Sequence, residues 1–248
     1  MNCIYLLWLL QVKRYSRSRA RILASLGQPL LILFILGFGV QPIFQKAGLG
    51  SYIQFLSPGV VGMALLSTSV LSGLGLVWDR QFGFLKATFV APEPRILIML
   101  GRTLGGATVA LAQGLITMVA CLVAGFRPYG IERVPMALMF MFLVALLFTA
   151  LGTAIASILT DFQGFQLIMN LLVAPISFLS GALYPLTNLP IILEWLTRLD
   201  PLSYGVDGLR GALIGTYRFN PLVDVAVLFI CTLVSLGIAG YLFSRIEL

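Results

Sequence analysis

The stretch Trp78–Arg95, WDRQFGFLKATFVAPEPR, is a charged interruption of about helix length between two long apolar runs. Within it, Phe82, Leu85 and Phe89 recur at i, i+3 and i+7, the spacing of one face of an α-helix. Asp79 stands where a helix favours an anion near its beginning, and two prolines near the end of the stretch would stop a helix. The stretch therefore predicts a short amphipathic helix along the membrane surface, with its apolar face turned inward.

This predicted helix spans 79–91, and its opposite face carries Arg80 and Phe84. A protruding aromatic ring beside a positive charge is a combination that protein docking surfaces use. An ordinary interfacial helix that only anchors two membrane spans would explain the same pattern. The residues alone leave both interpretations open, a docking element and a passive anchor.

The composition is that of a membrane protein. Of the 248 residues, 59% are hydrophobic and 10% are charged, and the mean hydropathy is +1.01, whereas roughly a quarter of the residues in soluble domains are charged. The net charge of +7 is spread over many short segments, which fits loops that face anionic lipid better than a surface for nucleic acid. We expect a lipid bilayer around the chain and no nucleic-acid partner.

Several kinds of chemistry are disfavoured by what the chain lacks. It contains no histidine, and its three cysteines, Cys3, Cys121 and Cys231, stand far apart, so histidine-based catalysis, a disulfide framework and the common zinc sites are not expected. No Gly-Lys pair occurs, which removes the phosphate-binding loop of P-loop ATPases. We expect no catalytic residue, no metal site and no cofactor bound by this chain itself.

The chain is predicted to be one transmembrane domain, 1–248, of the all-α polytopic class. The segment 1–21 has too short an apolar part to span a bilayer and is predicted to be an interfacial helix. The six apolar stretches that are long enough to cross are 22–40, 55–77, 100–124, 134–159, 165–183 and 222–243. An even number of spans places both termini on one side. Ten of the sixteen Lys and Arg residues fall on that side, which predicts that both termini and the amphipathic helix are cytoplasmic.

The segment 186–218, between the last two predicted spans, is not a plain loop. Prolines divide it into two short helical pieces, about 191–199 and 203–214, neither of which is long enough to cross a bilayer. Asp207 and Arg210 stand at i and i+3, where they can pair. We expect a re-entrant extracellular helical hairpin that caps the outer end of a pathway, or else a lid that is packed there for stability.

The predicted spans hold few polar side chains and, in their central parts, no lysine or arginine. An ion-coupled carrier usually needs ionisable groups there, so this class is disfavoured. Hydroxyl and amide groups suit a pathway for amphiphilic or lipid-like cargo, and the candidate lining residues are Ser67, Thr68, Ser69, Asn170, Ser177 and Ser180. Such residues more often bond to their own or a neighbouring helix, which is the competing explanation. In the third span, Gly101-x-x-x-Gly105 permits close approach of another helix.

Two motifs, in this order and with six predicted spans around them, resemble those of a known family. The first is Asp79-Arg80-Gln81-Phe82-Gly83-Phe84-Leu85-Lys86 with Ala91-Pro92. The second runs from Ser180-Gly181 through Tyr184-Pro185, Leu189-Pro190 and Asp200-Pro201-Leu202-Ser203-Tyr204 to Asp207 and Arg210. Over essentially its whole length, the chain resembles the membrane permease subunit of type-2 ABC exporters, which serve drug and lipid export in bacteria and archaea. Gln81 departs from that family's pattern, in which Glu is common.

The resemblance implies a role for each motif. The ATPase-coupling residues would be Asp79, Arg80, Gln81, Phe82, Gly83, Phe84, Leu85 and Lys86. The extracellular gate would comprise Gly181, Pro185, Pro190, Pro201, Asp207 and Arg210. The implied partners are two copies of a soluble ABC ATPase, which binds ATP and Mg, and a second permease copy in a homodimer or heterodimer. The implied function is outward transport of a drug, lipid or glycolipid across the cell membrane of a prokaryote.

Two other functions stay open at this point. A membrane-embedded enzyme that modifies lipid could use the carboxylates of Asp200, Asp207 or Asp224, although general acid–base catalysis needs two groups held at one substrate. A non-transporting membrane anchor or assembly subunit would also account for the apolar spans. Turnover of lipid without an ATPase would favour the enzyme, and a dimer interface without a cavity would favour the anchor.

Overall fold

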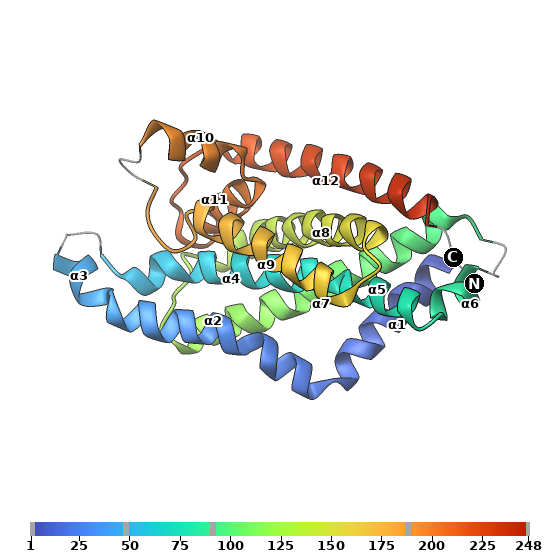
Figure 1. Cartoon of the computed structure of the whole chain (residues 1–248). Coiled ribbons are helices and arrows are strands. Elements are labelled where there is room, and N and C mark those ends of the chain that lie inside the picture. Colours follow the sequence, from blue (N-terminus) through green and yellow to red (C-terminus); the bar gives the residue numbers. More distant parts are fainter. Residues whose placement is uncertain (1–2, 47–49, 90–92, 187–189, 247–248) are drawn as a thin grey trace.

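The computed structural model describes residues 3–46, 50–89, 93–186 and 190–246, apart from the side chains at 19–21, 23, 24, 86, 87, 89 and 131. All regular structure within these ranges is helical, and the long helices run side by side in one bundle (Figure 1). The prediction of an all-α chain is confirmed.

Five helices of the described chain are long and apolar enough to cross a membrane. They are the continuous pair α4 and α5 (Tyr52–Ser72 and Leu74–Gln81), α7 (Arg95–Val123), α8 (Val134–Ile158), α9 (Phe162–Leu179) and α12 (Pro221–Ser244). Each coincides with one predicted span. The remaining predicted span, 22–40, falls in α2 (Arg19–Gly39), of which the part Ser25–Gly39 counts as a shorter apolar helix. That sixth crossing stays a prediction.

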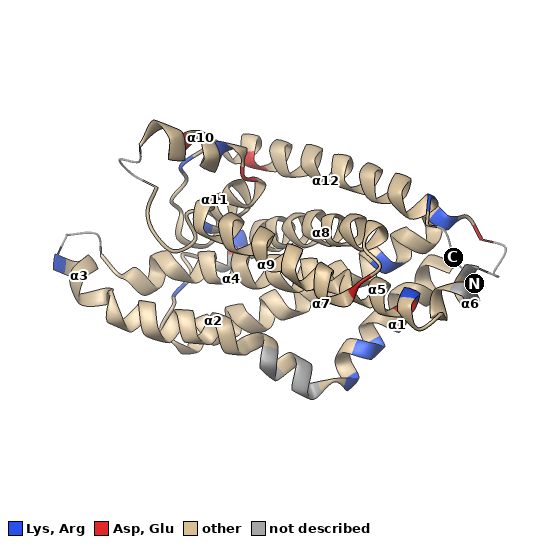
Figure 2. Cartoon of the chain, viewed as in Figure 1, with Lys and Arg blue, Asp and Glu red and all other residues tan. Residues whose placement is uncertain are grey.

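The two ends of the bundle carry different elements (Figure 1). One end, called the terminal end below, holds the start of α1 (Cys3–Arg17), α6 (Phe84–Phe89), the end of α12 and both chain termini. The other, called the hairpin end, holds α3 (Gln41–Lys46), the 3-10 turn η1 (Ile131–Arg133), α10 (Ile191–Leu199) and α11 (Pro201–Ile214). Lys and Arg gather toward these two ends, as expected where an apolar bundle meets water (Figure 2).

Glycine allows the central helices to touch. A Cβ on Gly73, at the junction of α4 and α5, would lie 2.4 Å from the carbonyl oxygen of Gly152 in α8. A Cβ on Gly152 would in turn lie 2.6 Å from the carbonyl oxygen of Val70. The two backbones therefore meet with no side chain between them, a packing that small residues permit in membrane helices. Phe148, one turn before Gly152 in α8, is fully buried.

The helix α1 packs along the first half of α7, and the glycine motif of α7 makes this possible. A Cβ on Gly101 would lie 3.0 Å from the backbone of α1, and a Cβ on Gly105 would lie 2.7 Å from the Cβ of Gln11. The Tyr15 hydroxyl also donates a hydrogen bond to the side-chain oxygen of Gln113. The predicted close approach is confirmed, and its partner is α1. The position of α1 at the membrane interface stays a prediction.

The two short helices predicted within 186–218 are present as α10 and α11, although residues 187–189 lie outside the described chain. Most side chains of α11 are buried, because this helix is wedged among α4, α8 and α12. The helix α10 instead exposes Ile191, Ile192 and Trp195. An outward apolar face of this kind suits contact with lipid, and re-entry of the hairpin into the membrane stays a prediction.

Candidate coupling site and transport pathway

Gly83 divides the predicted coupling helix in two. α5 ends at Gln81 and α6 begins at Phe84, with Gly83 between them at φ +75°. Glycine adopts this left-handed conformation without the steric cost that a Cβ brings. The prediction of one continuous helix over 79–91 is therefore wrong, and the last two residues of that range lie outside the described chain.

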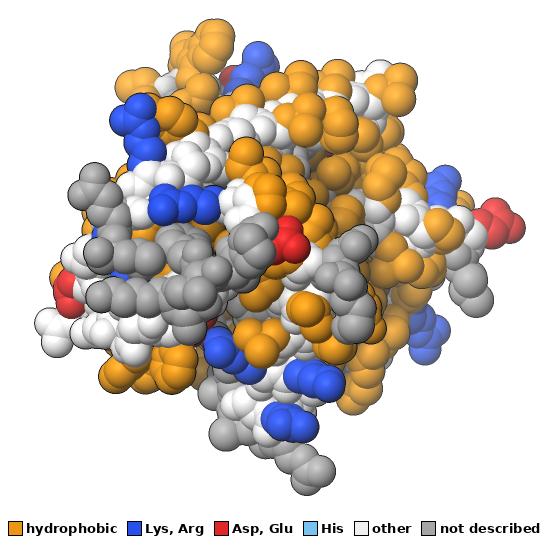
Figure 3. Space-filling view, turned by 90° about the vertical axis from the view of Figure 1, so that its right-hand side faces the viewer, with side chains coloured by type: hydrophobic (Ala, Val, Ile, Leu, Met, Phe, Trp, Pro, Cys, Tyr) orange, Lys and Arg blue, Asp and Glu red, His pale blue; other side chains and the backbone are white. Residues whose placement is uncertain are grey.

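The break changes which aromatic side chains face inward. Leu85 is fully buried, as predicted, but Phe82 is 61% exposed and does not share its face. The helical spacing that relates the two positions does not continue through Gly83. Phe84, predicted to protrude, is 64% exposed. Two phenylalanine rings therefore stand at the surface of the terminal end, where hydrophobic side chains lie among Lys and Arg (Figure 3).

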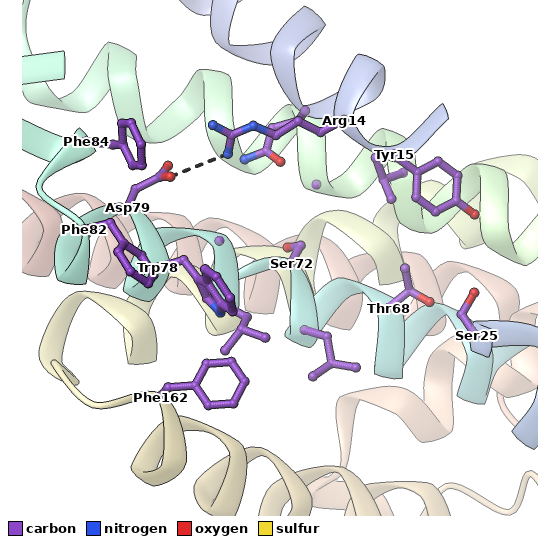
Figure 4. A pocket seen from close by; sticks show the side chains of 16 residues that line it. Arg14, Tyr15, Ser25, Thr68, Ser72, Trp78, Asp79, Phe82, Phe84 and Phe162 are labelled. Carbon is purple, nitrogen blue, oxygen red and sulfur yellow. Dashed lines mark ion pairs between the residues drawn. The ribbon is translucent and has the colours of Figure 1, made fainter. Parts of the chain in front are cut away.

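Asp79 was predicted to lie near the beginning of a helix, but it lies in the last turn of α5. The C-terminal end of a helix is the negative end of its dipole, so a carboxylate there needs a counter-charge. Arg102 of α7 supplies one in a direct ion pair. Arg14 of α1 lies 3.5 Å from the other carboxylate oxygen (Figure 4). Asp79 and Arg102 are each 8% exposed. This carboxylate ties together α1, α5 and α7.

Arg80 does not stand beside Phe84 on a free surface. Its guanidinium donates a hydrogen bond of 3.3 Å to the carbonyl oxygen of Ser157, near the end of α8. This contact joins α5 to α8, so the predicted coupling segment is connected to two spans besides its own. Gln81 is exposed, and the side chain of Lys86 lies outside the described part of the chain.

A pocket of about 740 Å³, called the terminal-end pocket below, opens beside this segment and is lined by residues of α1, α2, α4, α5, α6, α7 and α9 (Figure 4). Part of its wall is aromatic: the centroid of the Trp78 ring lies 5.3 Å from that of Phe82 and 5.8 Å from that of Phe162. Thr68 and Ser72 contribute hydroxyl groups from α4. An apolar wall with a few polar groups is typical of a site for a small amphiphile.

The three candidate pathway residues of α4 have different environments. Thr68 lines the pocket, and Ser67 is partly exposed. The Ser69 hydroxyl is buried, and no described residue forms a hydrogen bond with it. Of these three, only Thr68 has a structural reason to meet a molecule in the terminal-end pocket.

The candidates on α9 and at its end are also divided. Asn170 is exposed, on a part of α9 where Leu167 and Leu171 are exposed as well. Ser177 and Ser180 are buried near the hairpin end, where the Ser180 hydroxyl donates to the Ser177 carbonyl. The six predicted pathway residues do not line one continuous channel within the described chain.

A second pocket, of about 550 Å³, lies at the hairpin end between α3, α4, the end of α9 and α11. The predicted gate residues that line it are Pro185, Asp207 and Arg210. Gly181 joins them through its carbonyl, which accepts a hydrogen bond of 3.1 Å from Arg210. Pro190 and Pro201 instead stand at the beginnings of α10 and α11, where proline is compatible with a helix start.

The predicted ion pair between Asp207 and Arg210 is not formed. The Asp207 carboxylate accepts hydrogen bonds from the backbone N–H groups of Arg218, at 2.9 Å, and Phe219, at 2.8 Å. These donors lie in the segment that follows α11, so the carboxylate fixes the path of that segment over its own helix. Satisfying buried backbone donors takes precedence over a pairing on the helix surface.

Arg210 points away from that carboxylate. Besides its bond to Gly181, its guanidinium carbon lies 4.0 Å from the centroid of the Phe55 ring in α4, a cation–π contact. Burial lowers the pKa of Arg210 to about 10, against the opposing attraction of Asp207. Among the described residues, no carboxylate therefore forms an ion pair with this cation at the hairpin-end pocket.

The carboxylates considered for an enzyme have different hydrogen-bond environments. Asp200 caps the beginning of α11 by accepting the N–H of Leu202, and burial raises its pKa to about 7. Asp224 is buried in the first turn of α12, and no described residue bonds to its oxygens. Of the three, only Asp207 lines the hairpin-end pocket.

Arg14 and Arg102 are functional candidates that no sequence motif singles out, because by sequence alone they are only positive charges near the membrane. A signal for Arg102 exists. It stands at the start of one apolar run, and Asp79 stands at the end of the preceding one. An acid and a base near the same membrane surface in consecutive spans are candidates for pairing.

Comparisons with known proteins agree with one another. A family model described as ABC-2 type transporter matches residues 2–214. Nodulation protein J of Rhizobium leguminosarum bv. trifolii is 30% identical over 210 residues, which cover 83% of this chain and 77% of that protein. The transport permease ycf38 of Pyropia yezoensis is 32% identical over 200 residues, or 78% of this chain and 68% of that protein. The inner membrane transport permease YadH of Escherichia coli (strain K12) is 26% identical over 166 residues, or 66% and 64%.

Proposed function

Because this chain belongs to the ABC-2 type transporter family, we propose that it is the permease subunit of an exporter that moves an amphiphilic or lipid-like molecule outward across the cell membrane of a prokaryote. Its relatives are transport permeases, so the chain is a permease and not an enzyme, and the lipid-modifying enzyme is set aside. The energy would come from ATP, bound with Mg by two copies of a separate ABC ATPase.

We place the terminal end in the cytoplasm. Ten of the sixteen Lys and Arg residues belong to the N-terminal segment, residues 78–102 and the C-terminal segment, and an excess of positive charge is typical of cytoplasmic loops. α6 and both termini lie there as well (Figure 1). A soluble ATPase in the cytoplasm could then reach the exposed aromatic rings of the coupling segment.

One observation supports the coupling role. The exposed aromatic rings of the coupling segment are close in sequence to side chains that contact α1, α7 and α8. Phe82 and Phe84 offer the rings. Asp79 pairs with arginines of α1 and α7, and Arg80 bonds to the end of α8. A displacement applied at the rings would be passed to these helices, because buried ion pairs and packed cores resist deformation.

A second permease copy would complete the pathway. The apolar side chains that α2 and α9 leave exposed include Leu31, Phe34, Leu167 and Leu171. In the proposed dimer such faces meet, and the cargo passes between the copies from the terminal-end pocket toward the hairpin end. The aromatic and hydroxyl lining of the terminal-end pocket supports an amphiphilic cargo.

The experiment compares Phe84→Ala with Phe229→Ala, which removes an exposed ring from α12, 52% exposed and remote from α6. Permease and partner ATPase are reconstituted in liposomes, and the ATP hydrolysis that the permease stimulates is measured. Loss of an aromatic anchor should weaken ATPase binding about tenfold or more for Phe84→Ala alone. Equal stimulation by both variants would reject the docking role and favour the non-transporting anchor.

A further inference from the structure

The hairpin-end pocket contains a guanidinium whose donors are mostly unused. Arginine has five N–H donors, and among the described residues Arg210 uses one, from Nη2 to the carbonyl of Gly181. Its Nε is buried and has no hydrogen-bond partner in the described chain. No described carboxylate lies within ion-pair distance of it, because the Asp207 carboxylate binds backbone N–H groups instead. A cation held in this way retains unused capacity to bind an anion.

The surroundings of this cation are positively charged and amphiphilic. The charged residues that line the pocket are two arginines and one aspartate, Arg210, Arg218 and Asp207. The remaining lining combines the rings of Phe44, Phe55 and Phe219 with the hydroxyls of Ser203 and Thr216. The guanidinium carbon of Arg210 lies 4.0 Å from the centroid of the Phe55 ring, and this contact restricts the position of the cation before a ligand binds.

We propose that this pocket binds the anionic head group of an amphiphile, a phosphate or a carboxylate, with Arg210 as the main charged contact. A planar guanidinium binds either group through two parallel hydrogen bonds. The aromatic rings would cover the apolar part that adjoins the head group. Burying an unpaired charge is costly, and a bound anion would compensate that cost when the pocket is occupied.

This site lies at the hairpin end of the bundle, and the proposed ATPase contact lies at the terminal end. Its binding reaction needs neither ATP nor transport. The permease alone can therefore be tested, and a failure of the exporter proposal would not change the result. The anion has two possible sources, a lipid of the bilayer or a free anion from water, and separate arms of the experiment distinguish them.

The experiment measures lipid bound to the purified permease by native mass spectrometry, with phosphatidylglycerol or phosphatidylcholine in the same detergent. Phosphatidylglycerol should bind more tightly, and Arg210→Gln should weaken its binding about tenfold, the loss of one charge-assisted contact. Arg198→Gln is the matched control, because Arg198 lies on α10 outside the pocket and pairs with Glu194. If inorganic phosphate competes with phosphatidylglycerol, the site also binds free anions. If inorganic phosphate does not compete, the site is specific for lipid head groups.

A second variant separates binding from folding, because Arg210→Gln also removes the bond to Gly181. Thr216 is exposed on the pocket wall, so Thr216→Trp should fill the pocket and lower phosphatidylglycerol binding while the thermal stability stays unchanged. Arg210→Lys, which keeps the charge without the planar fork, should retain part of the binding. Equal binding of the two lipids, or unchanged binding in both Arg210→Gln and Thr216→Trp, would overturn the proposal.

Discussion

Replacing Arg102 by leucine should destabilise this permease far more than replacing Arg14, the other arginine that contacts Asp79. It leaves the Asp79 carboxylate buried, with only the half-exposed Arg14 beside it. Removing one partner of a buried ion pair costs about 3–5 kcal/mol of the free energy of unfolding. Arg14→Gln should cost under about 1 kcal/mol, because exposed pairs are screened by water.

The assay is thermal unfolding of the purified permease in a mild detergent. At about 2–4 °C per kcal/mol for a chain of this size, Arg102→Leu should lower the melting temperature by roughly 6–20 °C, and Arg14→Gln by under about 4 °C. The double variant Asp79→Leu with Arg102→Leu should recover most of the loss, because no uncompensated charge remains. Equal losses for the two arginine variants, or no recovery in the double variant, would refute this reasoning.

Three further predictions follow from particular contacts. Gly105→Leu should detach α1 from α7, because a Cβ there would lie 2.7 Å from that of Gln11; limited proteolysis should then cut α1, and unchanged protection would contradict the packing. Gly83→Ala should destabilise by about 1–2 kcal/mol because of its left-handed backbone, whereas Gly75→Ala, within α5 and with open space around its Cβ, should be neutral or stabilising; thermal melts should rank them so. Burial raises the pKa of Asp200 to about 7, so the folded state keeps a proton that the unfolded chain releases near pH 4. Stability should therefore fall as the pH rises from about 4 to about 7, and Asp200→Asn, which can still cap α11, should flatten that slope in melts against pH.

The sequence by itself determined the features that depend on local order. Long apolar runs predict helices of spanning length, since every backbone polar group must be satisfied within the helix in lipid, and five of them have the length and hydropathy to cross. The positions of the prolines predicted α10 and α11, because proline lacks a backbone N–H and so limits where a helix can begin and end. The glycine pair of α7 indicated a close helix contact, though not that α1 would fill it.

Only the tertiary structure decided the partners of the charged side chains. Asp79 meets an arginine 23 residues away, and Arg210 turns from the aspartate one turn before it to a carbonyl 29 residues before it in the chain. Helix spacing fixes which side chains share a face, but the crossing of two helices fixes which faces meet. The left-handed Gly83 likewise shifts the register between Phe82 and Leu85, because a single backbone rotation reorients everything after it. Pairing and exposure at both ends of this permease are therefore properties of the packed bundle.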